Sequence, residues 1–223
     1  MAQIVTKTMR TVFGTNPTSS ARYLFEGTLA SAAGATMAGS MTIDSVDAHN
    51  GRSPCKGHAG SAIFPALFAS ADGRGMTRQD VATYLALAYE ISYGAGLTQH
   101  DTCTDYHTSG AWTAVGVAAM TARILGCDPD QIHEAAGIGE YHGPRSQMMR
   151  CIDHPTMVRD GVGWGAPTGI TAGFLAHNGF TGAPALTCQG PHWAGLGTSW
   201  KLVTDTHYKP YPCCRWSHPS IDA

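Results

Sequence analysis

The sequence predicts a mainly α-helical fold, and three observations support that expectation. Segments with helical spacing of apolar residues alternate with loops rich in glycine, proline and histidine. Helix start and stop signals border several of these segments. Strand signals are weak and are confined to Ile4–Phe13 and Trp200–Val203. No repeat and no low-complexity run interrupts this pattern, so we expect one helical domain.

The first two expected helices differ in composition. Residues Thr28 to Met41 are almost all Ala, Gly, Ser and Thr, and such small side chains let backbones approach closely. We therefore expect a tightly buried helix there. A second helix begins after a capping pattern at Thr77 and extends to about Tyr93. Its apolar stripe consists of Val81, Tyr84, Leu85 and Ala88.

Two further helices have clear boundaries in the sequence. One runs from Gly110 to Leu125 and ends at Gly126, a residue type that favours the turn after a helix. The next begins after Asp128, with Pro129 in its first turn and Gln131 completing a capping box.

The last long helix is expected from about Trp164 to His177, with Pro167 delaying its start. Glycines at 161, 163 and 165 resemble a phosphate-binding loop only loosely, because the GxxxxGK[ST] pattern and a preceding strand are both missing. We expect these glycines to serve close helix packing instead.

Composition limits the classes of function. The chain of 223 residues is 43% hydrophobic and only 13% charged, so we expect another subunit or further chain to cover part of its surface. A net charge of −2 argues against a nucleic-acid partner. The uncharged stretches 27–43 and 161–200 are diluted by small and polar residues, so no membrane span is expected.

The cysteines and the N-terminus indicate a reducing compartment. Seven cysteines are scattered without a CxxC pair, which fits neither a disulfide framework nor a zinc ribbon. The first ten residues, MAQIVTKTMR, lack the apolar core of a signal peptide. The expected location is therefore cytoplasmic.

Acid–base residues concentrate in three loops, covering residues 47–60, 100–107 and 145–164. His58 and His107 each precede an expected helix, and helix N-termini favour anions such as carboxylates. Lys56, Arg150 and Arg159 supply cations that bind carboxylates. Each of these residues also has a plain structural interpretation, as a turn cap, a backbone-bonded histidine or a surface ion pair.

A zinc site is an alternative interpretation of the same loops. Cys55 and His58, together with Cys103 and His107, offer two thiolates and two imidazoles, a set that zinc accepts. These spacings also arise by chance in a chain with eleven histidines.

Several segments, taken in order, resemble the MmgE/PrpD family. They carry its acidic motif, a Gly-His run that continues into Pro-Ala-Leu, a His-Thr-Ser-Gly helix start, an Asp-Gly-x-Gly-Trp segment and a Lys-Pro-Tyr-Pro run. In this sequence these are residues 44–51, 56–67, 106–126, 157–166 and 209–223. The acidic motif departs from the family's Asp-x-Asp-Asp-Thr form, because Asp47 is followed by Ala-His-Asn-Gly. Arg159 replaces a family lysine.

The resemblance implies a helical domain joined to an α/β lid, a dimer, and metal-free chemistry on di- or tricarboxylic acids. By this comparison residues 1–208 form a helical domain shortened at its N-terminus, and residues 209–223 begin the connection to a missing lid domain. The resemblance places Asp47, His58 and His107 at active-site positions, with Arg159 nearby.

We therefore expect a lyase, either a dehydratase or a decarboxylase, that needs no metal or other cofactor. Asp47 and His107 are the candidate bases and His58 the candidate acid, while Lys56, Arg150 and Arg159 hold the substrate carboxylates. The alternatives are an epimerase or isomerase of a dicarboxylic acid, and a non-catalytic remnant or subunit. The expected partner is a second copy or a separate lid-domain chain.

Overall fold

The computed structural model describes residues 1–15 and 21–223 and confirms a mainly α-helical fold. Within these residues, β pairing is limited to four isolated bridges. The longer helices are α1 (Ala2–Phe13), α2 (Ala32–Ser45), α3 (Gly60–Ala71), α4 (Arg78–Thr102), α5 (Gly110–Ile124), α6 (Pro129–His142) and α8 (Val162–His177). Shorter elements are α7 (Met149–Asp153), η1 (Leu186–Cys188), η2 (Pro191–Trp193), α9 (Lys201–Asp205), η3 (Arg215–Ser217) and α10 (His218–Asp222).

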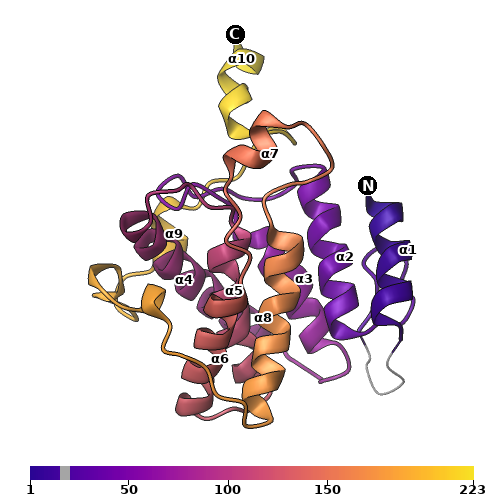
Figure 1. The fold of residues 1–223 in the computed structure, drawn as a ribbon, viewed down its shortest axis with the longest axis vertical. Coiled ribbons are helices and arrows are strands. Elements are labelled where there is room, and N and C mark those ends of the chain that lie inside the picture. Colours follow the sequence, from indigo (N-terminus) through magenta and orange to yellow (C-terminus); the bar gives the residue numbers. More distant parts are fainter. Residues whose placement is uncertain (16–20) are drawn as a thin grey trace.

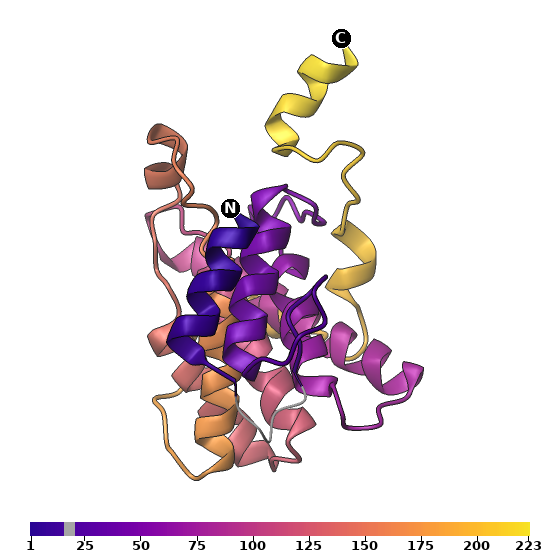
Figure 2. The same ribbon diagram turned by 90° about the vertical axis from the view of Figure 1, so that its right-hand side faces the viewer.

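Helix α5 forms the centre of the bundle. Every residue from Gly110 to Ala122 is buried, and the helix packs against α3, α4, α6 and α8. A helix that is surrounded on all sides has to be apolar or small around its whole circumference, as this one is. Helices α1 and α2 lie at one edge of the bundle and α4 at the other (Figure 1). The C-terminal helix α10 stands away from the bundle (Figure 2).

Three glycines of α8 allow it to approach α5 closely. A Cβ atom added at Gly165 would overlap the backbone of Gly110. A Cβ at Gly169 would lie 2.6 Å from the Cβ of Val117, and one at Gly173 would lie 2.7 Å from that of Thr121. Spacing of four residues places all three on one face of α8. The glycine-rich segment at the start of α8 therefore serves helix packing, as predicted.

The predicted helix caps are present. The Thr77 hydroxyl accepts the Asp80 N–H at 3.2 Å, and the Asp80 carboxylate accepts the Thr77 N–H at 2.9 Å. Asp128 and Gln131 make the same reciprocal pair at the start of α6. Because each pair satisfies two N–H groups at a helix start, these boundaries are encoded locally.

Both strand predictions are wrong. Residues Ile4–Phe13 lie in α1, where Val5 and Met9 are spaced one helical turn apart and pack into the core beside α2. Residues Trp200–Val203 enter the one-turn helix α9, whose Leu202 N–H is accepted by a buried glutamate of α4. Tertiary contacts therefore override the β-branched composition of both segments.

Three helix boundaries also differ from those predicted. Helix α4 continues past Tyr93 to Thr102, because Gly94 and Gly96 pack beneath tryptophan rings rather than ending the helix. Helix α2 begins at Ala32, after Ser31 caps the Gly34 N–H, and it is tightly buried as expected. Helix α8 begins two residues before the predicted start.

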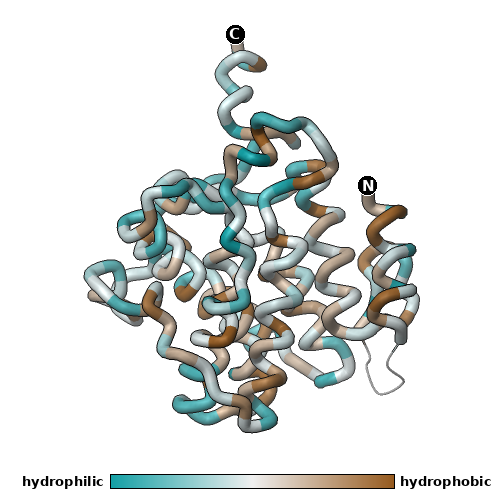
Figure 3. The backbone as a smooth tube through the Cα atoms, in the orientation of Figure 1, coloured by the Kyte–Doolittle hydropathy of each residue, from teal (hydrophilic) through white to brown (hydrophobic). Residues whose placement is uncertain are grey.

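Hydropathy follows this arrangement. In Figure 3 the bundle helices are coloured mostly white to brown, and much of the hydrophilic colour lies in connecting segments, including those around α7. None of the helices in the described part of the chain combines the length and the apolar character that a membrane crossing requires.

Candidate active site

Three loops meet beside the N-terminus of α5. They are the α2–α3 loop, the α4–α5 loop, and the segment between α6 and α8 that contains α7. The Ser109 hydroxyl accepts the His58 N–H at 2.9 Å, and the Ser109 N–H donates to Asp160 at 3.0 Å. Through these two bonds, Ser109 of the α4–α5 loop connects His58 of the α2–α3 loop to Asp160 of the third segment.

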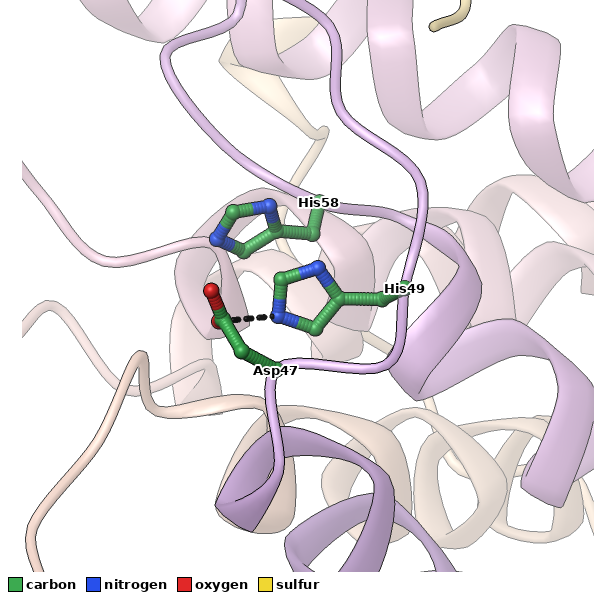
Figure 4. Close-up of side chains that lie close together, drawn as sticks. All are labelled: Asp47, His49 and His58. Atoms are coloured by element: carbon green, nitrogen blue, oxygen red, sulfur yellow. Dashed lines mark ion pairs between the residues drawn. The ribbon is translucent and has the colours of Figure 1, made fainter. Parts of the chain in front are cut away.

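Asp47 is a carboxylate held between two cations. Its Oδ1 lies 2.8 Å from His49 Nε2 (Figure 4). Its Oδ2 accepts a hydrogen bond of 2.5 Å from Lys209 Nζ. Burial alone would raise the pKa of Asp47, but the bonds and charges of His49 and Lys209 outweigh it and hold that pKa well below its usual range. The backbone φ of Asp47 is +56°, a conformation that aspartate tolerates better than most residues.

His49 faces oxygen acceptors on both sides of its ring. Its Nδ1 lies 3.2 Å from the Asn50 carbonyl oxygen, and its Nε2 faces the carboxylates of Asp47 and, at 3.7 Å, Asp44. An imidazole can donate from both nitrogens only when it is protonated. Burial opposes that charge, but the nearby carboxylates of Asp44 and Asp47 raise the pKa of His49 to about 9. His49 is therefore a buried imidazolium.

His58 lies against His49 and has the opposite protonation preference. The two ring centroids are 3.7 Å apart (Figure 4). Burial and the neighbouring His49 charge lower the pKa of His58 to about 3. Its Nδ1 lies 3.3 Å from the Asn50 carbonyl oxygen, which accepts the single ring proton. The unprotonated Nε2 then faces Asp160 Oδ2 at 3.5 Å.

Asp160, which comes just before α8, is a buried carboxyl group beside the N-terminus of α5. Its backbone N–H donates to Asp44 Oδ2 at 3.1 Å, and its Oδ1 accepts the Ser109 N–H. Burial and the charge of Asp44 raise the pKa of Asp160 to about 7, against the lowering effect of Ser109. Its buried Oδ2 has no hydrogen-bond partner. A proton on this oxygen can therefore be donated to His58 Nε2.

A cavity of about 1020 Å³ opens beside this cluster. His107 and Asp44 line it, together with Arg145, Arg150 and Arg159 from the segment around α7. Among the described residues, none of these three arginines has a carboxylate partner. Arg159 donates only to the Ser45 carbonyl oxygen, at 3.4 Å. Unpaired guanidinium groups on one wall are available for an anionic ligand.

The sequence-predicted residues thus fall in two adjoining places. Asp47 and His58 share the buried cluster, whereas His107, Arg150 and Arg159 face the cavity. Lys56 belongs to neither, since its exposed ammonium lies 5.8 Å from the ring centre of Tyr106. Asp44 connects the two places, because it lines the cavity and also contacts His49 and Asp160.

The structure groups possible metal ligands differently from the zinc set that the sequence suggests. Asp47, His49 and His58 place one donor atom each within 4.8 Å of the others, and over residues 1–15 and 21–223 no second such group of three occurs. The zinc set inferred from spacing is therefore not gathered. Cys55, one of its members, is buried with its thiol donating to the Tyr93 carbonyl oxygen.

Sequence reasoning assigned no role to several residues of this site. His49 and Asp160 lie in the loops that were singled out, and Asp44 lies one helical turn before Asp47, but nothing in the sequence indicates which of them are buried. Lys209 is 162 residues from Asp47, so no local signal connects the two. Arg145 belongs to the third loop and was not distinguished from other surface arginines.

Comparisons with known proteins match most of the chain to one family. The family model described as the MmgE/PrpD N-terminal domain matches residues 2–195. Two cis-aconitate decarboxylase sequences from Aspergillus terreus, one of them from strain NIH 2624 / FGSC A1156, are each 24% identical to the chain over 228 residues. These alignments cover 85% of the chain and 44% of each relative, so the chain spans less than half of the length of these proteins.

Proposed function

The chain belongs to the MmgE/PrpD family, and from that premise we propose that it carries the acid–base residues of a lyase acting on a small di- or tricarboxylic acid. One observation supports this most directly. An ionised Asp47 and a neutral His58 lie together, and Asp44 connects their cluster to a cavity lined by three arginines that have no carboxylate partner among the described residues. The name of the decarboxylase relatives is consistent with a substrate of this class.

In a dehydration or an epimerisation, the proposed chemistry starts with removal of a proton from the carbon next to a substrate carboxylate. In a decarboxylation, carbon dioxide leaves instead, and the carbon that keeps the electron pair takes up a proton. Asp47 is the proposed base, because His49 and Lys209 keep it ionised. The proton taken up by Asp47 is afterwards released to solvent, and the neighbouring His58 and Asp160 hold one further proton between them. From the cavity wall, His107 is placed to protonate the leaving group or the product carbon. Arg150 and Arg159 are the proposed carboxylate ligands.

We propose that this chemistry uses no metal. The negative charge of Asp47 is already compensated by two protein cations. A divalent ion held by Asp47, His49 and His58 would have to displace the Nε2 proton of His49 and would face the Lys209 ammonium group at close range. Both effects disfavour a cation at this point.

Solvent deuterium exchange tests the proposal without requiring complete turnover. The protein is incubated in D2O with methylcitrate, cis-aconitate or iminodisuccinate, and loss of the C–H signal is followed by NMR. We expect exchange or product formation with at least one acid, and loss of it in Asp47→Asn and His58→Gln. Exposed His133 provides the matched control, because His133→Gln removes an imidazole far from the site.

The same experiment separates the candidate reactions. A lyase yields an alkene or carbon dioxide, whereas an epimerase or isomerase yields neither. Wild-type protein that exchanges no proton on any of the three acids, although its arginines bind them, would argue for a non-catalytic role. Exchange that survives in both Asp47→Asn and His58→Gln would refute the assigned site.

We further propose that efficient turnover requires a cover over the cavity, supplied by further protein or by a partner chain. An open cavity admits water, which weakens the attraction between arginines and substrate carboxylates. Light scattering combined with turnover assays tests this. A monomer of this chain with rapid turnover would contradict it.

A further inference from the structure

Residues 200–209, here called the strap, carry Lys209 to the active site. The strap includes α9 and lies against the α2–α3 loop and helix α4. The Lys209 side chain is only 4% exposed, and its Nζ donates to Asp47 and, at 2.9 Å, to the Cys213 carbonyl oxygen. Without the strap in place, this ammonium group would be solvated and distant from Asp47.

Arg52 makes the ionic contacts that hold the strap to the α2–α3 loop. Its guanidinium donates to the Lys201 carbonyl oxygen at 2.5 Å and pairs with Asp205 at 2.9 Å. The group lies 4.9 Å from the centre of the Tyr93 ring, and the residue is only 5% exposed. A buried guanidinium with these partners binds both ends of α9 at once.

Two other contacts accompany Arg52. The buried Glu90 carboxylate accepts the Leu202 N–H at 2.5 Å and lies 3.8 Å from the Lys201 ammonium group. Gly51 and His207 exchange backbone hydrogen bonds of 2.9 and 2.8 Å. Arg52 directly follows Gly51 in the chain. The Arg52 side chain therefore binds the strap at Asp205, four residues before Lys209, and the Gly51 backbone binds it at His207, two residues before Lys209.

We propose that Arg52 is a positioning residue, which fixes the strap against the bundle so that Lys209 reaches Asp47. The catalytic consequence rests on the proposed function, since it assumes that Asp47 acts as the base. The positioning itself does not, because it is a property of the folded chain alone.

The physical reason is the loss of a buried guanidinium that joins a carbonyl oxygen and a half-exposed carboxylate of the strap. Replacing Arg52 by alanine leaves the Lys201 carbonyl oxygen and the Asp205 carboxylate without their donor, and removes the cation that packs on Tyr93. Losses of this kind favour the open form of a docked segment by on the order of 100-fold. Glu90 and the Gly51–His207 bridge still bind the strap, so we expect release of the strap rather than global unfolding.

Lysine labelling measures the position of Lys209 directly. Wild-type protein is treated briefly with acetic anhydride, and modification of each lysine is quantified by mass spectrometry with exposed Lys7 as the internal standard. In wild type, Lys209 should react far more slowly than Lys7. In Arg52→Ala its rate should rise at least tenfold, and added guanidinium ion should restore protection by occupying the vacated space. Asp205→Asn should give the same change with a smaller amplitude.

Arg22→Ala is the matched control. Arg22 also pairs with an aspartate and donates to a carbonyl oxygen, but it is exposed and lies outside the site. It should leave Lys209 protected. Equal protection of Lys209 in wild type, Arg52→Ala and Asp205→Asn would overturn the proposal. Labelling that rises as predicted in a protein that exchanges no proton with any of the three carboxylic acids would refute the proposed function and leave the positioning role intact.

Discussion

The centroids of the His49 and His58 imidazole rings lie 3.7 Å apart, and the two ring planes are tilted by 31°. Two imidazolium ions at this separation would repel each other strongly, so one ring takes the charge and the other stays neutral. The neighbours decide which ring is charged. His49 faces carboxylates at Nε2, whereas His58 faces the carboxyl group of Asp160, which still keeps about half of its proton at neutral pH.

Removing the charge of His49 should therefore raise the pKa of His58. In His49→Gln the repulsive neighbour is gone, and burial remains as the main cause that lowers the pKa of His58 below 6.5. We expect the His58 ring signals to titrate at clearly higher pH than in wild type, where its pKa is about 3. Heteronuclear NMR of the histidine rings measures this, with His133→Gln as the control. An unchanged His58 titration would show that burial alone sets it.

Asp160 should make stability fall as pH rises. Its pKa is raised from 3.8 to about 7 in the folded protein, so between these values the unfolded chain has lost the proton that the folded chain keeps. Its contribution is present below pH 3.8 and is lost as pH rises through about 7. A shift of this size corresponds to about 4 kcal/mol.

The test is the free energy of unfolding of wild type and Asp160→Asn across this range. Asparagine mimics the protonated carboxyl group and can still donate to His58, so the variant should gain stability relative to wild type as pH rises from about 4 to about 7. The lowered pKa of His58 makes the free energy of unfolding rise with pH in the same range, but it does so in wild type and variant alike. As a control, replacing the exposed Asp130 by asparagine should leave the pH dependence of the free energy of unfolding parallel to that of wild type. A constant difference between wild type and Asp160→Asn would contradict a buried acid.

The helices that could be predicted are those with local signals. The caps at Thr77 and Asp128 follow from side chains three residues apart, and the structure confirms both. What the sequence could not supply is the effect of distant partners. No residue near Leu202 in the sequence indicates that its N–H binds the carboxylate of Glu90, so composition alone predicts a strand where α9 forms. In the same way, the sequence around Gly94 does not indicate that this glycine packs beneath the distant Trp193 inside a continuous helix.

In the site, too, local sequence signals identify some residues, whereas contacts with distant residues could not be predicted. Asp47, His58 and His107 lie in loops that the sequence singles out, because their charge stands out in a chain poor in charged residues. Their division between a buried cluster and a cavity wall depends on side-chain direction, which spacing alone does not define. The partnership of Asp47 with Lys209 depends on the course of the strap across the bundle.

Glycine at 169 should be essential to the packing of α8 on α5. Alanine is the better helix former, so propensity alone predicts that Gly169→Ala stabilises. The added Cβ would lie 2.6 Å from the Cβ of Val117, however, and both helices would have to shift. We expect a loss of about 1–3 kcal/mol in denaturant unfolding. Thr171→Ala, on an exposed position of the same helix, should stay within about 0.5 kcal/mol of wild type. A stabilised Gly169→Ala would mean that the helices are not in tight contact.

The cavity arginines and Lys56 should differ sharply in their effect on ligand binding. Arg150 and Arg159 line the cavity without carboxylate partners, so a bound tricarboxylate gains their charge without breaking an existing ion pair. Lys56 lies outside the cavity lining, against Tyr106. Removing one guanidinium–carboxylate contact should weaken binding by about 1.5–3 kcal/mol, which is at least tenfold in Kd.

Titration calorimetry with a tricarboxylate and with its monocarboxylate analogue measures this difference. Arg150→Gln and Arg159→Gln should each weaken binding of the tricarboxylate at least tenfold, whereas Lys56→Gln should change it by less than about threefold, as for a screened surface charge. The penalty should shrink for the monocarboxylate and at high salt, because fewer charges meet and exposed ones are screened. Equal losses in all three variants would mean that general electrostatic attraction, and not this cavity wall, binds the ligand. A large effect of Lys56→Gln alone would place the ligand on the other side of Tyr106 and return Lys56 to the role that the sequence predicted for it.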